Sequence, residues 1–141
     1  MRTMAIDYGD QRIGLAVSDL LGMLAGEAWT MQEWDMERAA SRIAEEAKAR
    51  DVGTLVLGLP RNMDGTEGFQ AGKVRQFCQQ LTQAGFEVVF QDERLSTVSA
   101  LEALAEGRVS PQDKKRNVDK IAASVILQQW LEDQHHQKKE G

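Results

Sequence analysis

The unbroken apolar run TLVLGL, residues 54–59, constrains the fold more than any other segment of this sequence. It has the length of a strand, and Pro60 ends it because proline cannot donate a hydrogen bond to a neighbouring strand. A strand that is apolar at every position is typical of a parallel sheet with helices on both faces. The run FEVVF, residues 86–90, has the same character. Together the two runs predict an α/β domain.

Strand patterns also precede the first helix. Residues 3–8 form a short apolar run that contains Asp7, and residues 9–11 have the composition of a turn. After the turn, apolar residues alternate with small or polar ones at Ile13, Leu15 and Val17, which predicts a second strand paired back as a hairpin. Residues 24–31 are a further candidate strand. The amino-terminal third of the chain is therefore expected to supply three strands.

Helical spacing of apolar residues predicts the remaining elements. One helix follows Asp35, a candidate N-cap, and the others cover segments 74–81, 98–105 (with Ser96 as a candidate cap) and 118–129. The predicted order is β-β-β-α-β-α-β-α-α, which is the order of ribonuclease H-like folds. We expect a five-stranded mixed sheet flanked by helices, formed by residues 1–132, with a polar tail at 133–141.

Composition narrows the class of protein. A chain of 141 residues can bury one hydrophobic core, and its single cysteine, Cys78, excludes an internal disulfide. No apolar run approaches the roughly 20 residues of a membrane span, so we expect a cytoplasmic protein without a membrane partner. The net charge of −5 argues against a uniformly basic nucleic-acid binder. Residues 108–120, however, hold five basic residues against two acidic ones, which is compatible with a local phosphate-binding surface or a solvated loop.

Three acidic residues occur where ordinary surface charge is not expected: Asp7, Glu93 and Asp119. The first two follow apolar strand segments, and the carboxyl ends of parallel strands are where sites collect in open α/β sheets. Asp119 is expected in the first turns of a helix, with Ala122 and Ala123 on its own face, small enough for close approach to the sheet. Clustered carboxylates repel one another unless a cation neutralises them, and an all-oxygen set suits Mg²⁺ or Mn²⁺. This pattern predicts metal-assisted phosphodiester hydrolysis, although any one of these acids alone could be an N-cap or part of an ion pair.

Two loops add candidate substrate contacts. Gly9 permits a tight turn whose amides can face a phosphate, and Arg12 can pair with phosphate or brace the carboxylates, although an ordinary hairpin turn would have the same sequence. The loop 58–66 leaves a strand and enters a helix, with Arg61 and Asn62 able to contact a nucleic-acid backbone and Thr66 able to cap the helix. Further basic candidates for substrate binding are Arg94, Lys115 and Arg116.

Four segments in this order resemble the YqgF (RuvX) family: AIDYGDQRIGLAVSD (5–19), VLGLPRNMDGTEG (56–68), DERLST (92–97) and VDKIAASVILQQWL (118–131). That family comprises ribonuclease H-like proteins related to RuvC-type Holliday junction resolvases and described as candidate pre-16S rRNA nucleases. The resemblance covers almost the whole chain and places the catalytic acids on Asp7, Glu93 and Asp119. It implies processing of the 5′ end of pre-16S rRNA, or cleavage of branched DNA, for which a homodimer would suit a symmetric junction.

Two other functions remain open at this point. An actin-like sugar or acetate kinase also begins with an acidic residue and a glycine turn, but its nucleotide site needs two such domains. A non-catalytic module could use the same fold to bind RNA or a protein of ribosome assembly or transcription, which the low overall charge favours and the three acids disfavour. Residues to which we assign no chemistry are two histidines in the polar tail (His135, His136) and Cys78 in the core. Three tryptophans, Trp29, Trp34 and Trp130, could stack on bases, but we expect them to pack in the core.

Overall fold

The computed structural model describes residues 1–60, 64–92 and 111–140, and within the last range it describes the side chains of 121–135. The strands are β1 (Arg2–Asp7), β2 (Arg12–Ser18), β3 (Ala25–Gln32), β4 (Val52–Leu59) and β5 (Glu87–Asp92). The helices are α1 (Met36–Ala49), α2 (Phe69–Gln83) and α4 (Pro111–Glu140). All five predicted strands are present, and the predicted helix after Ser96 lies outside the described residues.

The strands form one mixed sheet in the order β3-β2-β1-β4-β5. The first three strands are antiparallel neighbours, whereas β4 pairs in parallel with both β1 and β5. The β1–β2 hairpin turn needs no crossover, but each parallel pair is joined through a helix, α1 before β4 and α2 before β5. The predicted mixed ribonuclease H-like sheet is confirmed.

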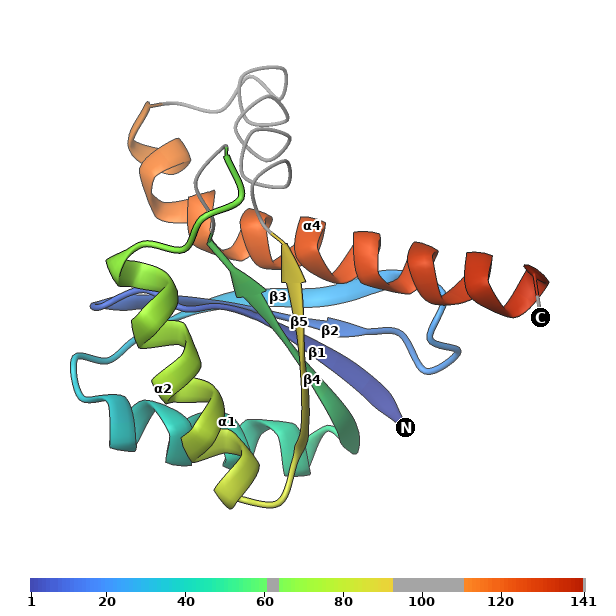
Figure 1. Ribbon diagram of the computed structural model, residues 1–141, viewed down its shortest axis with the longest axis horizontal. Helices are drawn as coiled ribbons and strands as arrows, with labels where there is room; N and C mark the ends of the chain where they lie inside the picture. The colour runs from blue at the N-terminus through green and yellow to red at the C-terminus, as the bar shows by residue number, and fades with distance from the viewer. Residues whose placement is uncertain (61–63, 93–110, 141) are drawn as a thin grey trace.

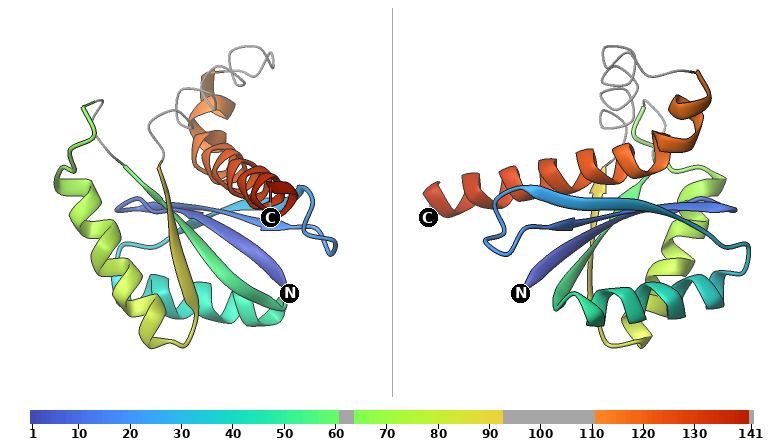
Figure 2. Two further views of the ribbon diagram at one scale, coloured as in Figure 1. Left: turned by 45° about the vertical axis from the view of Figure 1, so that its right-hand side comes forward. Right: turned by 180° about the vertical axis from the view of Figure 1, so that it is seen from behind.

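Helices cover both faces of the sheet (Figures 1 and 2). On one face α1 and α2 bury Ile43, Phe77 and Leu81 against large side chains of the strands, among them Ile6, Leu15 and Leu57. On the other face α4 crosses β2, β1 and β3. Its buried residues Ala123, Ile126, Leu127 and Leu131 meet the small side chains of Ala5 and Ala16. Small residues on both sides let α4 approach the sheet closely.

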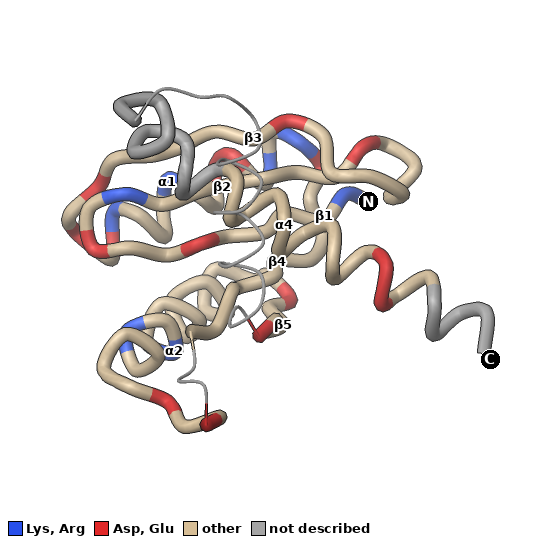
Figure 3. Tube along the Cα trace, turned by 90° about the horizontal axis from the view of Figure 1, so that it is seen from above, with Lys and Arg blue, Asp and Glu red and all other residues tan. Residues whose placement is uncertain are grey.

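The arrangement of the helices explains why the run 54–59 is apolar at every position. Leu55, Leu57 and Leu59 join the core beneath α1 and α2, whereas Val56 joins the core beneath α4. Alternate residues of a strand point to opposite faces, so a strand covered on both sides must be apolar throughout. Charged residues accordingly lie on the helices, on the loops and near the ends of strands, with both signs intermixed (Figure 3).

Of the two N-caps predicted for helices α1 and α2, the one at α1 is confirmed and the one at α2 is wrong. Asp35 caps α1 as expected, its side chain accepting a hydrogen bond from Arg38 N at 2.9 Å. Thr66 does not cap α2, which begins at Phe69 after Gly68. Instead the backbone N–H and hydroxyl of Thr66 donate to Asp64 Oδ1, at 3.0 and 2.6 Å, so Asp64 organises a separate turn before the helix.

The polar segment after residue 132 was expected to be a frayed tail, and this was wrong. The backbone of α4 continues to Glu140, because the segment contains no proline or internal glycine to end the helix. His135 Nε2 lies 3.2 Å from the carbonyl oxygen of Gly22 in the β2–β3 loop, which joins the end of α4 to the sheet. No helix within the described ranges is long and apolar enough to cross a membrane.

Candidate active site at the carboxyl edge of the sheet

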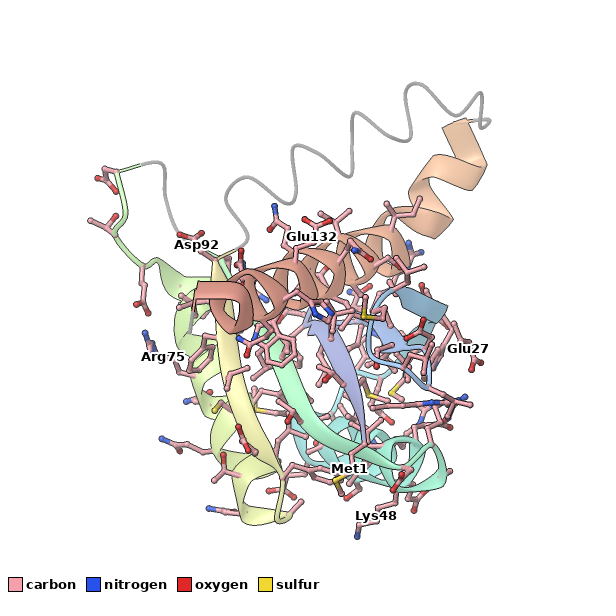
Figure 4. All side chains as sticks on the ribbon, turned by 90° about the vertical axis from the view of Figure 1, so that its right-hand side faces the viewer. Met1, Glu27, Lys48, Arg75, Asp92 and Glu132 are labelled. Carbon is pink, nitrogen blue, oxygen red and sulfur yellow. The ribbon has the colours of Figure 1, made fainter. Side chains whose placement is uncertain are left out.

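Asp7 is the last residue of β1 and lies at the edge where the parallel strands end. Register pairs Ile6 with Leu57 of β4 and pairs Leu59 with Asp92 of β5, so the carboxyl ends of the three strands lie together. Figure 4 shows Asp92 at this edge, with Met1 and Lys48 at the opposite one. Residue 93 directly follows β5 in the chain. The sequence predicted that Asp7 and Glu93 meet at the carboxyl ends of the parallel strands. In the structure β1 and β5 both end at that edge.

Strand alternation assigns Asp7 to the face covered by α4. Its neighbours Ile6 and Tyr8 pack in the core beneath α1 and α2, whereas Ala5 packs beneath α4. Asp7, two residues after Ala5, shares the α4 face and is half-buried there. Asp7 therefore lies on the face of the sheet that is covered by α4, the helix that contains residue 119.

Glycines flank Asp7 on that face. Its cross-strand partner in β2 is Gly14. In β4, Gly58 follows Val56 by two positions and therefore shares the α4 face, one residue beyond the Ile6–Leu57 pair. At these two positions, therefore, neither neighbouring strand places a side chain beside Asp7.

The α4 helix covers the face of the sheet on which Asp7 lies. Residue 119 lies one helical turn before Ala122 and Ala123, which are 5% and 0% exposed against the sheet. The backbone at 119 is helical, as expected, but α4 begins at Pro111, so residue 119 lies about two turns inside the helix and not at its start. Its side chain lies outside the described residues, as do the side chains of Lys115 and Arg116.

The turn after Asp7 is built on a close backbone approach. A Cβ at Gly9 would lie 2.5 Å from the carbonyl oxygen of Arg12, so only glycine fits this position. Asp10 forms an ion pair with Lys73 of α2 at 2.9 Å, and Gln70 Nε2 donates to the carbonyl oxygen of Tyr8 at 3.4 Å. These contacts give Gly9 a structural role and fix the turn against α2.

Other predicted site residues fall outside the described part of the chain. These are Arg61, Asn62, Glu93 and Arg94. Among the described residues, no group of three or more His, Cys, Asp or Glu side chains could hold a metal ion. Asp7 is the one member of the predicted acidic triad whose side chain is described, so the meeting of the three acids stays a prediction.

Sequence reasoning missed a groove beside the same edge. Tyr8, Asp10 and Gln11 line it from the β1–β2 turn, and the other lining residues are Trp34, Met36, Lys73 and Gln76. Tyr8 stacks on Phe77 with ring centroids 4.5 Å apart, and burial raises the pKa of its hydroxyl, with smaller contributions from Asp10 and Asp35. Trp34 was expected to pack, but it is 66% exposed. Residue type alone left base stacking as the alternative to packing and did not decide between them.

Comparison with known proteins agrees with this geometry. The family model RuvX, described as Holliday junction resolvase, matches residues 1–133. A protein of Clostridioides difficile (strain 630), named as a candidate pre-16S rRNA nuclease, is 42% identical over 132 residues, which cover 93% of this chain and 94% of the relative. A protein of Myxococcus xanthus (strain DK1622) with the same name is 43% identical over 133 residues, covering 94% and 88%.

Solved structures share the fold at low sequence identity. Thermus thermophilus RuvC in complex with a Holliday junction substrate superposes with a TM-score of 0.62 at 16% identity, covering 96% of each chain. Fowlpox virus resolvase in complex with Holliday junction DNA gives a TM-score of 0.64 at 9% identity, covering 95% of this chain and 99% of the resolvase. With the family match over nearly its full length, the chain belongs to the RuvX family and is a nuclease with a ribonuclease H-like fold.

Proposed function

We propose that this nuclease uses Mg²⁺ or Mn²⁺ to process the 5′ end of pre-16S rRNA, with Asp7, Glu93 and Asp119 as its metal-binding and catalytic acids. The observation that supports it most is the placement of Asp7, which ends a central strand, faces α4 and has glycines as neighbours on that face. The two relatives at 42% and 43% identity, both named as candidate pre-16S rRNA nucleases, support the choice of substrate.

Strand and helix periodicity support the convergence of the other two acids. In β5, Val88 packs beneath α1 and α2 and Val89 packs beneath α4, so the alternation predicts the α4 face for residue 93. In α4, residue 119 is spaced by three, four and seven positions from Ala122, Ala123 and Ile126, the spacing of one helix face. Both patterns converge on the face of Asp7.

The residues suit a hard divalent cation. Carboxylate oxygens are the ligands that Mg²⁺ and Mn²⁺ prefer, and both strands next to β1 have glycines beside Asp7. When bound, such an ion activates water and stabilises the leaving oxygen of the phosphodiester.

The chain's own residues would position the nucleic acid. Asp7 would hold the cation at the strand ends, and through it the reacting phosphate, since Asp7 lies on a paired strand and not on a free loop. Arg12 and the basic positions Arg61, Arg94, Lys115 and Arg116 would neutralise flanking phosphates, with Asn62 and the Gly9 amide as further backbone contacts. A precursor of the small-subunit rRNA places this activity in the cytoplasm. A single chain would suffice for an RNA end.

Asp7→Asn tests the proposal because it keeps the size of the side chain and removes its charge. We expect cleavage of a precursor-rRNA mimic with Mg²⁺ or Mn²⁺ to fall by roughly 100-fold or more, and EDTA to abolish it. Asp51→Asn is the matched control: Asp51 is exposed at the opposite edge, and asparagine tolerates its φ of 56°. Equal cleavage by wild type and Asp7→Asn would refute the proposal, and binding of RNA without cleavage by wild type would favour the non-catalytic module.

The second candidate substrate is a four-way DNA junction. The description of the RuvX family model and the likeness to two resolvase structures favour it. Two symmetric cuts would require a homodimer, so the same assay on a junction should be accompanied by sedimentation analysis. Faster cleavage of the junction than of the rRNA mimic, by a dimeric protein, would select this alternative.

A further inference from the structure

We propose that the groove formed by Tyr8, Trp34, Met36, Lys73 and Gln76 binds one unpaired nucleobase of the substrate strand, next to the phosphate held at Asp7. This inference rests on the proposed nuclease function and adds a substrate class to it, namely strands with an unpaired nucleotide beside the cleavage site.

The groove adjoins the candidate active site in the chain and in space. Tyr8 directly follows Asp7, and Trp34 follows the end of β3. Because β3 is antiparallel to β2 and β2 is antiparallel to β1, the end of β3 lies at the same edge as Asp7. The β3–α1 loop, the β1–β2 turn and the start of α2 meet at one end of the molecule in Figures 1 and 2.

Trp34 is presented to solvent on a fixed backbone. Glu33 Oε2 accepts hydrogen bonds from the N–H groups of Trp34 and Asp35, at 3.1 and 3.3 Å. Glu33 N donates to the carbonyl oxygen of Gln11 at 3.0 Å, and Arg42 Nη1 donates to that of Gln32 at 2.8 Å. A large aromatic residue that is 66% exposed on a braced loop is a stacking surface that needs little ordering on binding.

The chemistry of the groove favours a base over a phosphate. Its one cation among the lining residues, Lys73, is already paired with Asp10 at 2.9 Å, and its ammonium also lies 4.7 Å from the centre of the Phe69 ring. The lining is therefore close to neutral. The rings and Met36 offer apolar contact, and the amides of Gln11 and Gln76 offer both donors and acceptors to a base edge. Its volume of about 460 Å³ is within the range of small-molecule sites.

The position of the groove dictates the state of the nucleotide. Asp7 faces α4, whereas Tyr8 packs on the side of α1 and α2, so the two sites lie on opposite sides of the sheet edge. A base that stays stacked in a continuous duplex could not reach the groove while its own phosphate lies at Asp7. The base must be unpaired and turned out of the strand.

The test measures binding of a single-stranded eight-nucleotide RNA in EDTA, where no cleavage occurs. Trp34→Ala should weaken binding about 5- to 100-fold, and Trp34→Phe, which keeps an aromatic ring, should restore most of it. An abasic oligomer of the same length should bind wild type and Trp34→Ala equally. Leu21→Ala is the control, since Leu21 is 84% exposed on the β2–β3 loop, at the other edge of the sheet.

Tryptophan fluorescence gives a second readout. The RNA should quench emission of the wild type but not of Trp34→Phe, because Trp29 and Trp130 are partly buried in the two cores. Unchanged RNA affinity and unchanged quenching in the Trp34 variants would overturn the inference while leaving the nuclease function intact if Asp7 remains essential for cleavage. A wild type that neither binds the RNA nor cleaves the precursor mimic would overturn both.

Discussion

Asp7 pairs with Gly14 across the antiparallel ladder of β1 and β2, so the carboxylate has no side chain opposite it on the neighbouring strand. Residues directly opposite one another in a ladder share a face of the sheet, and their Cβ atoms would lie about 4.5–5.5 Å apart. A side chain at position 14 would therefore lie beside the Asp7 carboxylate, where the proposed metal-bound phosphate would have to fit.

We expect substitution of Gly14 to lower activity in proportion to the size of the new side chain. Gly14→Ala should reduce kcat about ten-fold and Gly14→Val about 100-fold, the scale of a misplacement of roughly 1 Å in an active site. Cleavage of the precursor-rRNA mimic measures this effect, with the melting temperature recorded in parallel. Gly72→Ala is the matched control, because a Cβ at Gly72 meets no atom within 4 Å. Full activity in Gly14→Val would show that the space beside Asp7 is not used.

The contact of α4 with the sheet is a second determinant of the site. Ala123 is 0% exposed and packs with Ala5 and Ala16, and it lies one turn after residue 119. Ala123→Leu would force the helix outward, at a cost of about 1–3 kcal/mol in the free energy of unfolding. We expect activity to fall more than the unfolded fraction explains, because residue 119 moves with the helix.

Denaturant titration and cleavage rates at a temperature where the variant stays folded separate the two effects of Ala123→Leu. Asp133→Leu adds the same side chain at an exposed position of α4 and should change neither quantity appreciably. Activity that follows the folded fraction alone would show that the spacing between α4 and the sheet does not position the site.

The spacing of apolar residues along the chain was enough to predict the strands of the sheet. The run 54–59 predicted a strand buried on both faces, and Leu57 and Val56 indeed face different cores. The position of Asp7 near the end of the first apolar run likewise predicted that it lies at the carboxyl edge. These features depend on residues close together in the sequence, whose alternation reflects the two faces of one element. They need no knowledge of which distant segments meet.

Features that depend on distant or competing contacts were not predictable. Trp34 is exposed on a loop whose preceding residue, Glu33, donates its N–H to Gln11, more than 20 residues earlier in the chain. Thr66 has the residue type of an N-cap, but its hydroxyl binds Asp64 and the helix starts later. The end of α4 is joined to the sheet by His135 and Gly22, which are 113 positions apart. In each case the local pattern was compatible with several outcomes, and a contact elsewhere selected one.

The stability of the loop that contains Trp34 is expected to depend on pH through the carboxylate of Glu33. The pKa of Glu33 lies below its ordinary value of 4.5, chiefly because its carboxylate accepts a hydrogen bond from Asp35 N–H. Burial opposes this shift, whereas Arg38, Arg42 and Trp34 N–H add to it. A lowered folded-state pKa means that this contribution to stability is complete above pH 4.5 and is lost as the pH falls through the folded-state value. Glu33→Gln should lower the melting temperature at pH 7, and its difference from the wild type should shrink as the pH falls below 4.5. Thermal unfolding followed by circular dichroism at pH 7, 4.5 and 3 checks this, with Glu45→Gln, on the exposed side of α1, as the control for removing one carboxylate. A difference that stays constant across the three pH values would mean that the charge of Glu33 does not stabilise the loop.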